Sequence, residues 1–136
     1  MAKKISEIEG IGEATAAKFE TAGIKTVDSL LDKGSQKSGR SEIAQASGIS
    51  ETVVLDFVNM ADLFRINGVA GQFAELLKAS GVDTVKELST RNAENLWAKL
   101  TEINTEKKLT RVVPSVDKVT DFISQAKELP QKVFHS

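Results

Sequence analysis

The sequence predicts an all-α fold, built from two tandem copies of one helical unit that pack as a single compact, pseudo-twofold domain. The chain has 136 residues, which allows one domain or two very small units sharing a core. Residues 8–31 match residues 66–89 at a constant offset of 58, without a gap, and mostly at glycine and apolar positions. Nowhere do Val, Ile and Thr alternate over the length of a strand. We therefore expect one domain over residues 1–136, with repeat 1 at about 5–64, repeat 2 at about 65–130 and a flexible tail at 131–136.

The first repeat is predicted to begin with two short helices. A helix over about 13–22 would bury Phe19 and stop at Gly23, because glycine is common just past a helix end. Thr26 can accept a backbone hydrogen bond and so cap a second helix that runs to about Leu31.

Residues 33–39 read as the one flexible loop of the chain, because they are rich in Gly, Ser and Lys. Residues 51–64 carry apolar side chains nearly all round, which is typical of a central buried helix. Their segment Asp56-Phe57-Val58 resembles Asp121-Phe122-Ile123 at an offset of 65. The second repeat has therefore gained about seven residues, which we place at 106–111.

The second repeat is predicted to hold three further helices after its own glycine turn and first helix. Thr84 and Glu87 fit the pattern of a capping box, in which two side chains satisfy each other's backbone N–H groups. Residues 93–103 carry leucine and isoleucine at helical spacing. Ser115 can cap a last helix, and Pro130 ends it.

Composition excludes several classes of protein. The formal net charge is -1 and the pI is about 5.9, which excludes a strongly basic nucleic-acid coat protein. The chain has no cysteine, which removes disulfides and thiolate chemistry. The single histidine, His135, is next to last, so we expect no enzyme, no cofactor and no metal site. No apolar run approaches the length of a bilayer span and no secretion signal is seen, so we expect a cytoplasmic protein without membrane contact.

The informative motif is Ile8-Glu9-Gly10-Ile11-Gly12, with a second copy at Ile66-Asn67-Gly68-Val69-Ala70. Glycine adopts positive φ at little cost, so each copy can turn sharply. The apolar residue between the small ones can then enter the core. The helix that follows would begin with free N–H groups, which together with the helix dipole form an anion site. A DNA phosphate fits there without any contact to a base.

This pattern resembles the helix-hairpin-helix family, whose members read Ile-x-Gly-Ile-Gly, a helix and then Gly-Ile. The whole chain, including Gly39 to Ala44, Ala61 to Ile66 and Pro114 to Leu129, looks like an uncharacterised bacterial family of tandem helix-hairpin-helix proteins. The resemblance implies the fold and leaves the activity open. Related hairpins bind DNA nonspecifically, sometimes with a monovalent cation, and others serve as protein-contact modules. Ala70 departs from the pattern, which weakens the phosphate site of the second copy.

Local charge leaves two functions open. Glu13 would lie where the first anion site opens, and lysines nearby, Lys18 among them, offset it in part. Lys107, Lys108 and Arg111 form a second basic cluster. We expect a non-enzymatic module that binds duplex DNA weakly and nonspecifically; the alternative is a protein-protein adaptor in which the hairpins are only architectural. The oligomeric state is left open. The candidate nucleic-acid-binding residues are Gly10, Ile11, Gly12, Lys18, Gly68, Val69, Ala70, Gly71, Lys107, Lys108 and Arg111.

Overall fold

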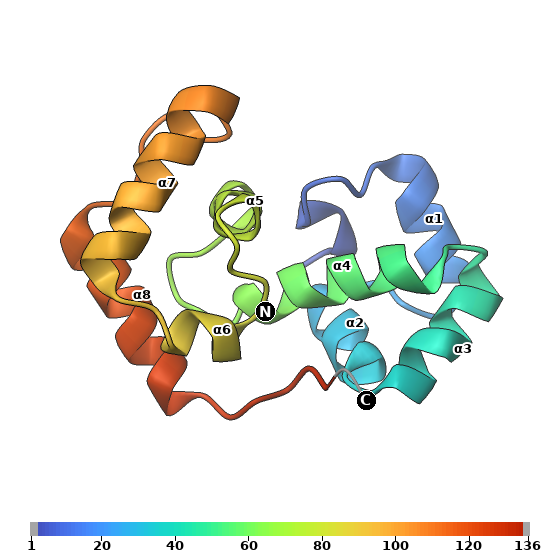
Figure 1. Cartoon of the computed structure of the whole chain (residues 1–136). Coiled ribbons are helices and arrows are strands. Elements are labelled where there is room, and N and C mark those ends of the chain that lie inside the picture. Colours follow the sequence, from blue (N-terminus) through green and yellow to red (C-terminus); the bar gives the residue numbers. More distant parts are fainter. Residues whose placement is uncertain (1–2, 135–136) are drawn as a thin grey trace. The chain divides into compact units, whose positions relative to one another are not determined.

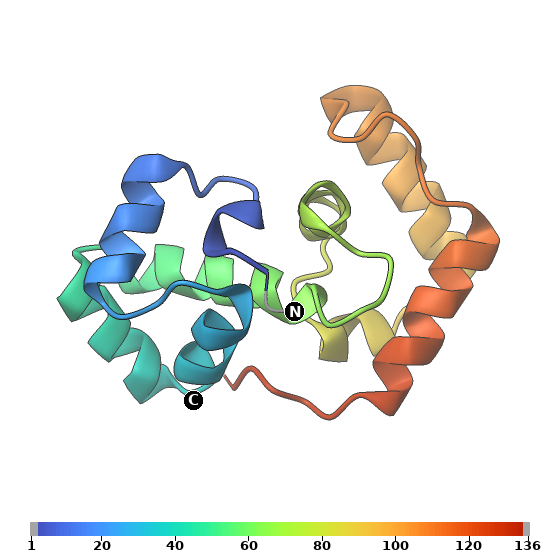
Figure 2. The same ribbon diagram turned by 180° about the vertical axis from the view of Figure 1, so that it is seen from behind.

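The computed structural model describes residues 3–134, and its fold is all-α, as the sequence predicts. Eight α-helices and one short 3-10 helix make up the regular structure of that part of the chain (Figures 1 and 2). Their bounds are η1 Ile5–Glu7, α1 Glu13–Thr21, α2 Val27–Gly34, α3 Lys37–Ser47, α4 Glu51–Leu63, α5 Gly71–Ala79, α6 Val85–Ser89, α7 Ala93–Lys107 and α8 Val116–Glu128. No helix within these residues is long and apolar enough to cross a membrane.

The chain divides into two compact units, each with its own core. Unit 1 comprises Met1–Asp62 and Lys132–Ser136, and unit 2 comprises Leu63–Gln131. In unit 1, α3 packs on α1 and α2, and η1 contacts the same two helices. In unit 2, α8 packs on α6 and α7, and α5 packs on α7 (Figure 1).

The core of unit 1 is built on two phenylalanines. Phe19 of α1 is fully buried and meets Phe57 of α4 edge to face, with 5.9 Å between the ring centroids. Ile8, Ile24 and Leu30 are fully buried in the same unit. Burying one such side chain contributes about 1.5–3 kcal/mol, so these short helices gain their stability from the shared core and not from helix propensity.

The duplication found in the sequence is repeated in the backbone of the two units. Ile24 N–H donates to the carbonyl of Phe19, and Val82 N–H donates to the carbonyl of Leu77, both at 2.9 Å. Gly23 and Gly81, which precede these donors, both have positive φ, at 81° and 92°. The offset of 58 therefore holds for backbone geometry as well as for residue type.

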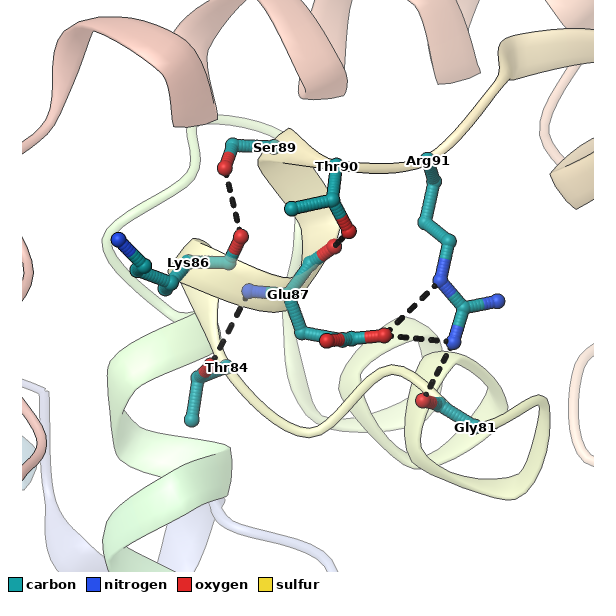
Figure 3. Close-up of polar contacts among 7 residues, drawn as sticks. All are labelled: Gly81, Thr84, Lys86, Glu87, Ser89, Thr90 and Arg91. Carbon is teal, nitrogen blue, oxygen red and sulfur yellow. Dashed lines mark hydrogen bonds and ion pairs between the residues drawn. The ribbon is translucent and has the colours of Figure 1, made fainter. Parts of the chain in front are cut away.

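The helix caps predicted at Thr26, Thr84 and Ser115 are confirmed: each side chain accepts a hydrogen bond from the backbone N–H three residues on. Only one of the two hydrogen bonds of the predicted capping box at Thr84 forms. Thr84 Oγ1 accepts from Glu87 N–H at 3.2 Å, but the Glu87 carboxylate pairs with Arg91 instead, at 2.9 and 3.1 Å (Figure 3). Arg91 Nη2 also donates to the carbonyl of Gly81 at 2.8 Å, so Arg91 ties α6 to the end of α5.

The predicted flexible loop at 33–39 is wrong. Gly34 is the last residue of α2 and Gly39 lies inside α3, so the connection between these helices is only Ser35 and Gln36. Glycine is required at both positions because other parts of the chain lie very close to the backbone there. A Cβ on Gly34 would lie 2.4 Å from Val58 Cγ2, and one on Gly39 would lie 1.8 Å from the carbonyl oxygen of Lys33. Absence of a side chain serves packing here, and not flexibility.

The flexible tail predicted at 131–136 is also wrong for residues 132–134, which belong to unit 1. Phe134 N–H donates to the carbonyl of Ser35 at 2.8 Å, Val133 is buried, and Lys132 pairs with Asp32 at 2.8 Å. Arg40 Nη2 donates to the carbonyl of Phe134 at 2.8 Å. His135 and Ser136 lie outside the described residues.

Arg40 is itself a buried cation. Its Nη1 donates to the carbonyls of Gly34 and Ser35, at 2.8 and 3.2 Å, so the guanidinium satisfies the end of α2 as well as the tail. Burial lowers the pKa of Arg40 from its usual value, and the nearby carboxylate of Glu51 acts in the opposite direction.

Candidate nucleic-acid interface

Two sharp turns carry the candidate site: the first glycine turn, residues 8–12, and the second glycine turn, residues 66–70. Gly10 and Gly68 have φ of 93° and 98°, a region that favours glycine. In each turn the next residue donates its N–H to the isoleucine that opens the turn, at 3.1 Å. Those residues, Ile11 and Val69, are buried, as predicted for the apolar position between the small ones.

Each turn rests on one phenylalanine. A Cβ on Gly10 would lie 3.4 Å from Phe57 Cε1, and a Cβ on Gly68 would lie 3.0 Å from Phe122 Cε1. Phe57 and Phe122 are the residues that the sequence pairs at an offset of 65. Both glycines are therefore fixed by backbone conformation and by the ring behind them, and both turns are held rigidly by their own unit.

The helices that follow the turns begin with unsatisfied N–H groups. Gly12 and Ala70 are the N-cap residues of α1 and α5, and neither has a side-chain hydrogen bond to its helix. The first intrahelical donors are the N–H groups of Ala16 and Ala74. Both N-cap residues are exposed, and a Cβ on Gly12 would meet nothing within 4 Å. Among the residues that carry the first donors, Glu13 and Ala14 of α1 and Gln72 of α5 are exposed, whereas Gly71 is buried.

The hollow beside the first glycine turn has a volume of about 730 Å³ and a mixed lining. Its walls hold two lysines, two glutamates and several apolar residues. They are Lys4, Ile5, Ser6, Ile11, Gly12, Glu13, Ala16, Ala17, Glu20 and Lys25. Lys18, a predicted site residue, lies in the last turn of α1 and is absent from these walls. Glu13 is in the first turn of α1, where it competes with an anion for the same donors.

The hollow beside the first turn of α5, the helix that follows the second glycine turn, has a volume of about 650 Å³ and a different charge. It is lined by Gln72, Asn104, Thr105, Lys108, Leu109, Thr110 and Arg111. None of the described residues in this lining is acidic, and two of them are cationic. Lys107 ends α7 and is exposed, but it does not line the hollow. Gly71 is buried as the first residue of α5.

The second glycine turn is also clamped from α8. Gln125 Oε1 accepts from the N–H of Asn67 at 2.8 Å, and Gln125 Nε2 donates to the carbonyl of Asn67 at 3.1 Å. Asp121 holds Gln125 in place by accepting from the same Nε2 at 2.9 Å. A turn fixed in this way presents its donors without further loss of backbone entropy on binding.

The loop that carries the cations is held by the side chain of Asn104. Its Nδ2 donates to the carbonyl of Thr110 at 3.0 Å, and its Oδ1 accepts from Thr110 N–H at 2.9 Å. Lys108 caps α7 with a φ of 52°, the one positive φ outside glycine among the residues described. Such a conformation costs a non-glycine residue about 1–2 kcal/mol, which draws attention to the lysine at this position.

Sequence reasoning did not count Gln72, Asn104, Thr105 and Thr110 among the candidate site residues, and it took Lys4 and Lys25 only as lysines near the first glycine turn. Gln72 could have been found from the duplication, because it lies in the first turn of the helix that follows the second glycine turn. The others come together only through packing of α7 on α5 and of η1 on α1. The sequence gives no signal for that packing.

The fold and the two turns define a class: all-α proteins made of a duplicated unit, in which a glycine turn leads into a helix with free N–H groups. Residues 9–129 match the family described as Domain of unknown function (DUF4332), and the chain belongs to that family. No curated protein matches this chain, and no solved structure matches it.

Proposed function

We propose that this protein binds duplex DNA weakly and without sequence preference, through phosphates held by helix N–H groups at the second glycine turn. One observation carries the proposal: the hollow at the first turn of α5, the helix that follows the second glycine turn, is lined by Lys108, Arg111 and Gln72, with no acidic side chain among its described walls. Phosphates attract clustered cations, and their contacts carry no sequence information.

The binding is expected to be modest because few cations take part. Each phosphate neutralised adds about 0.9 to the slope of log affinity against log salt, so two or three contacts give a slope of about 2–3. The first glycine turn contributes less, since Glu13 and Glu20 line its hollow. This reverses the order given by the sequence, in which Ala70 made the second copy the weaker site.

The experiment measures anisotropy of a dye-labelled duplex of about 20 base pairs over a range of salt concentrations. The decisive variants are Ala70→Asp and Gly12→Asp. Aspartate is a favourable N-cap residue, so it should stabilise the helix by about 1 kcal/mol relative to Ala70 and by a few tenths of that relative to Gly12, while its carboxylate occupies the donors. We expect Ala70→Asp to lose most of the affinity at low salt and Gly12→Asp to lose little.

Charge variants separate the hollow from the rest of the surface. Lys108→Gln and Arg111→Gln should each lower the salt slope by about 0.9. Lys18→Gln is the matched control, since Lys18 is exposed but lies outside both hollows. Absence of binding by the native chain at low salt would overturn the proposal.

A second candidate function has a specific observation in its favour. The larger hollow in unit 1 combines Ile5, Ile11 and two alanines with charges of both signs. An apolar floor rimmed by both lysine and glutamate suits a peptide better than a polyanion. We propose a protein adaptor as the alternative, tested by the same variants: Gly12→Asp would then weaken a partner's binding and Ala70→Asp would not.

A further inference from the structure

Unit 2 differs from unit 1 chiefly at the end of α7. This helix has 15 residues, whereas its counterpart α3 has 11. The loop after α7 spans residues 108–115, whereas the loop after α3 spans residues 48–50. The inserted residues that the sequence predicts therefore lie in an extended helix end and in a longer loop, which lines the same hollow as Gln72 of α5. Figure 2 shows this loop leaving the end of α7 and running back to α8.

The inserted loop has a fixed shape. Besides the two hydrogen bonds from Asn104, Thr110 Oγ1 donates to the carbonyl of Val112 at 3.0 Å. Lys108 N–H donates to the carbonyl of Asn104 at 2.8 Å. Thr110 is buried, so the loop has an inward anchor. Three residues of the loop are thus held by one asparagine and one threonine.

The anchor turns an apolar side chain outward. Val112 is 72% exposed, the highest value among the exposed large hydrophobic residues of the described chain; the others lie between 37% and 39%. Lys108 and Arg111, which line the hollow, both precede Val112 in the same loop. An apolar side chain held in contact with water keeps its unfavourable hydration, and here it directly follows one of the cations that the proposed function assigns to DNA phosphates.

We infer that Val112 is a wedge that enters the minor groove of bound duplex DNA and bends it. This inference rests on the proposed function and adds to it a contact that phosphate binding alone does not require. Apolar side chains inserted between base steps partly unstack them and bend the duplex by about 20–90°. The bend is expected at flexible pyrimidine-purine steps such as TA, where deformation costs least. Lys108 and Arg111, which precede Val112 in the loop, would hold the phosphates of the bent step.

The test uses the full chain and a duplex of about 30 base pairs with a central TA step and a fluorophore at each end. At saturating protein we expect energy transfer between the ends to rise. Val112→Ala should remove about half or more of that rise while changing affinity less than about threefold, because the phosphate contacts remain. Val112→Ile, with a longer side chain, should keep or increase it.

The matched control is Val53→Ala, a half-exposed valine of unit 1 far from the loop in sequence. It should alter neither affinity nor energy transfer. Binding by the native chain without any rise in transfer would overturn the wedge and leave the proposed function standing. An equal rise in energy transfer with Val112→Ala would also overturn the wedge and leave the proposed function standing. Absence of binding would overturn both.

Discussion

Asn104 binds the backbone of Thr110 through both atoms of its side-chain amide, at 3.0 Å from Nδ2 to the carbonyl and 2.9 Å from the N–H to Oδ1. The two residues are six apart in sequence, and the pair closes the loop that follows α7. Because Thr110 is buried, water could not replace these two hydrogen bonds if the Asn104 side chain were removed. The position of Lys108 and Arg111 beside the first turn of α5 therefore depends on the side chain of Asn104.

Replacement of Asn104 tests this dependence. We expect Asn104→Ala to lower the free energy of unfolding by about 1–3 kcal/mol, because two buried backbone groups lose their partners. Urea denaturation followed by circular dichroism measures the change. Thr105→Ala is the control: Thr105 is exposed on the same helix and bonds only back to the carbonyl of Thr101. Its change should stay within about 0.5 kcal/mol, and equal losses for both variants would contradict the role given to Asn104.

The neighbouring lysines at the end of α7 should respond in opposite directions to glycine. Lys108 has a φ of 52°, so Lys108→Gly should raise the free energy of unfolding by about 1 kcal/mol. Lys107 is the last residue of the helix, so Lys107→Gly should lower it by up to about 1 kcal/mol.

DNA binding supplies the second measurement on the same two variants. Lys108→Gly should lower the salt slope by about 0.9, because Lys108 lines the hollow, and Lys107→Gly should leave it unchanged. A variant that is more stable and yet binds less cannot be explained by misfolding. If both lysines gave the same slope, the hollow would not be the phosphate site.

The three glycines of the turns should differ in their tolerance of alanine. Gly68→Ala adds a Cβ at 3.0 Å from Phe122 to a residue with a φ of 98°, and Gly10→Ala adds one at 3.4 Å from Phe57 with a φ of 93°. We expect losses of about 2–4 and 1–2 kcal/mol in unfolding free energy, since the first combines backbone strain with crowding. Gly12→Ala is the control, because its φ is -89° and its Cβ would meet nothing. Thermal unfolding measures the order of the three losses in stability. A loss for Gly12→Ala equal to that for Gly68→Ala would be inconsistent with this geometry.

Arg40 should decide whether the tail stays on unit 1. Arg40→Ala removes the donor of three carbonyls, those of Gly34, Ser35 and Phe134, and should cost about 2–4 kcal/mol of stability. Limited proteolysis should then cleave the chain near Phe134. Arg40→Lys retains the charge but not the fork of donors, so an intermediate loss is expected. If the alanine variant stayed as protected as the native chain, Val133 and the Lys132–Asp32 pair would suffice to hold the tail.

Local features of the fold were readable from the sequence, because each depends on residues close together in the chain. The caps at Thr26, Thr84 and Ser115, the apolar plugs at Ile11 and Val69, and the all-α class were all predicted correctly. The errors at 33–39 and 132–134 share one cause. In a sequence, a glycine that makes the backbone flexible cannot be told from a glycine that packs closely against a distant residue, and the same holds for a charged chain end. Val58, which packs on Gly34, and Arg40, which binds Phe134, are both distant in sequence from the residues they contact.

The sequence alone determined that a unit was duplicated, where each copy turns, and that Phe19, Ile11 and Val69 are buried. Only the tertiary structure decided which turn carries the favourable charge, since Lys108 and Arg111 reach Gln72 through the packing of α7 on α5. The reason is physical. Periodicity, capping and turn preference act over a few residues and leave their mark in the pattern, whereas the charge of a hollow is a sum over side chains that tertiary packing brings together.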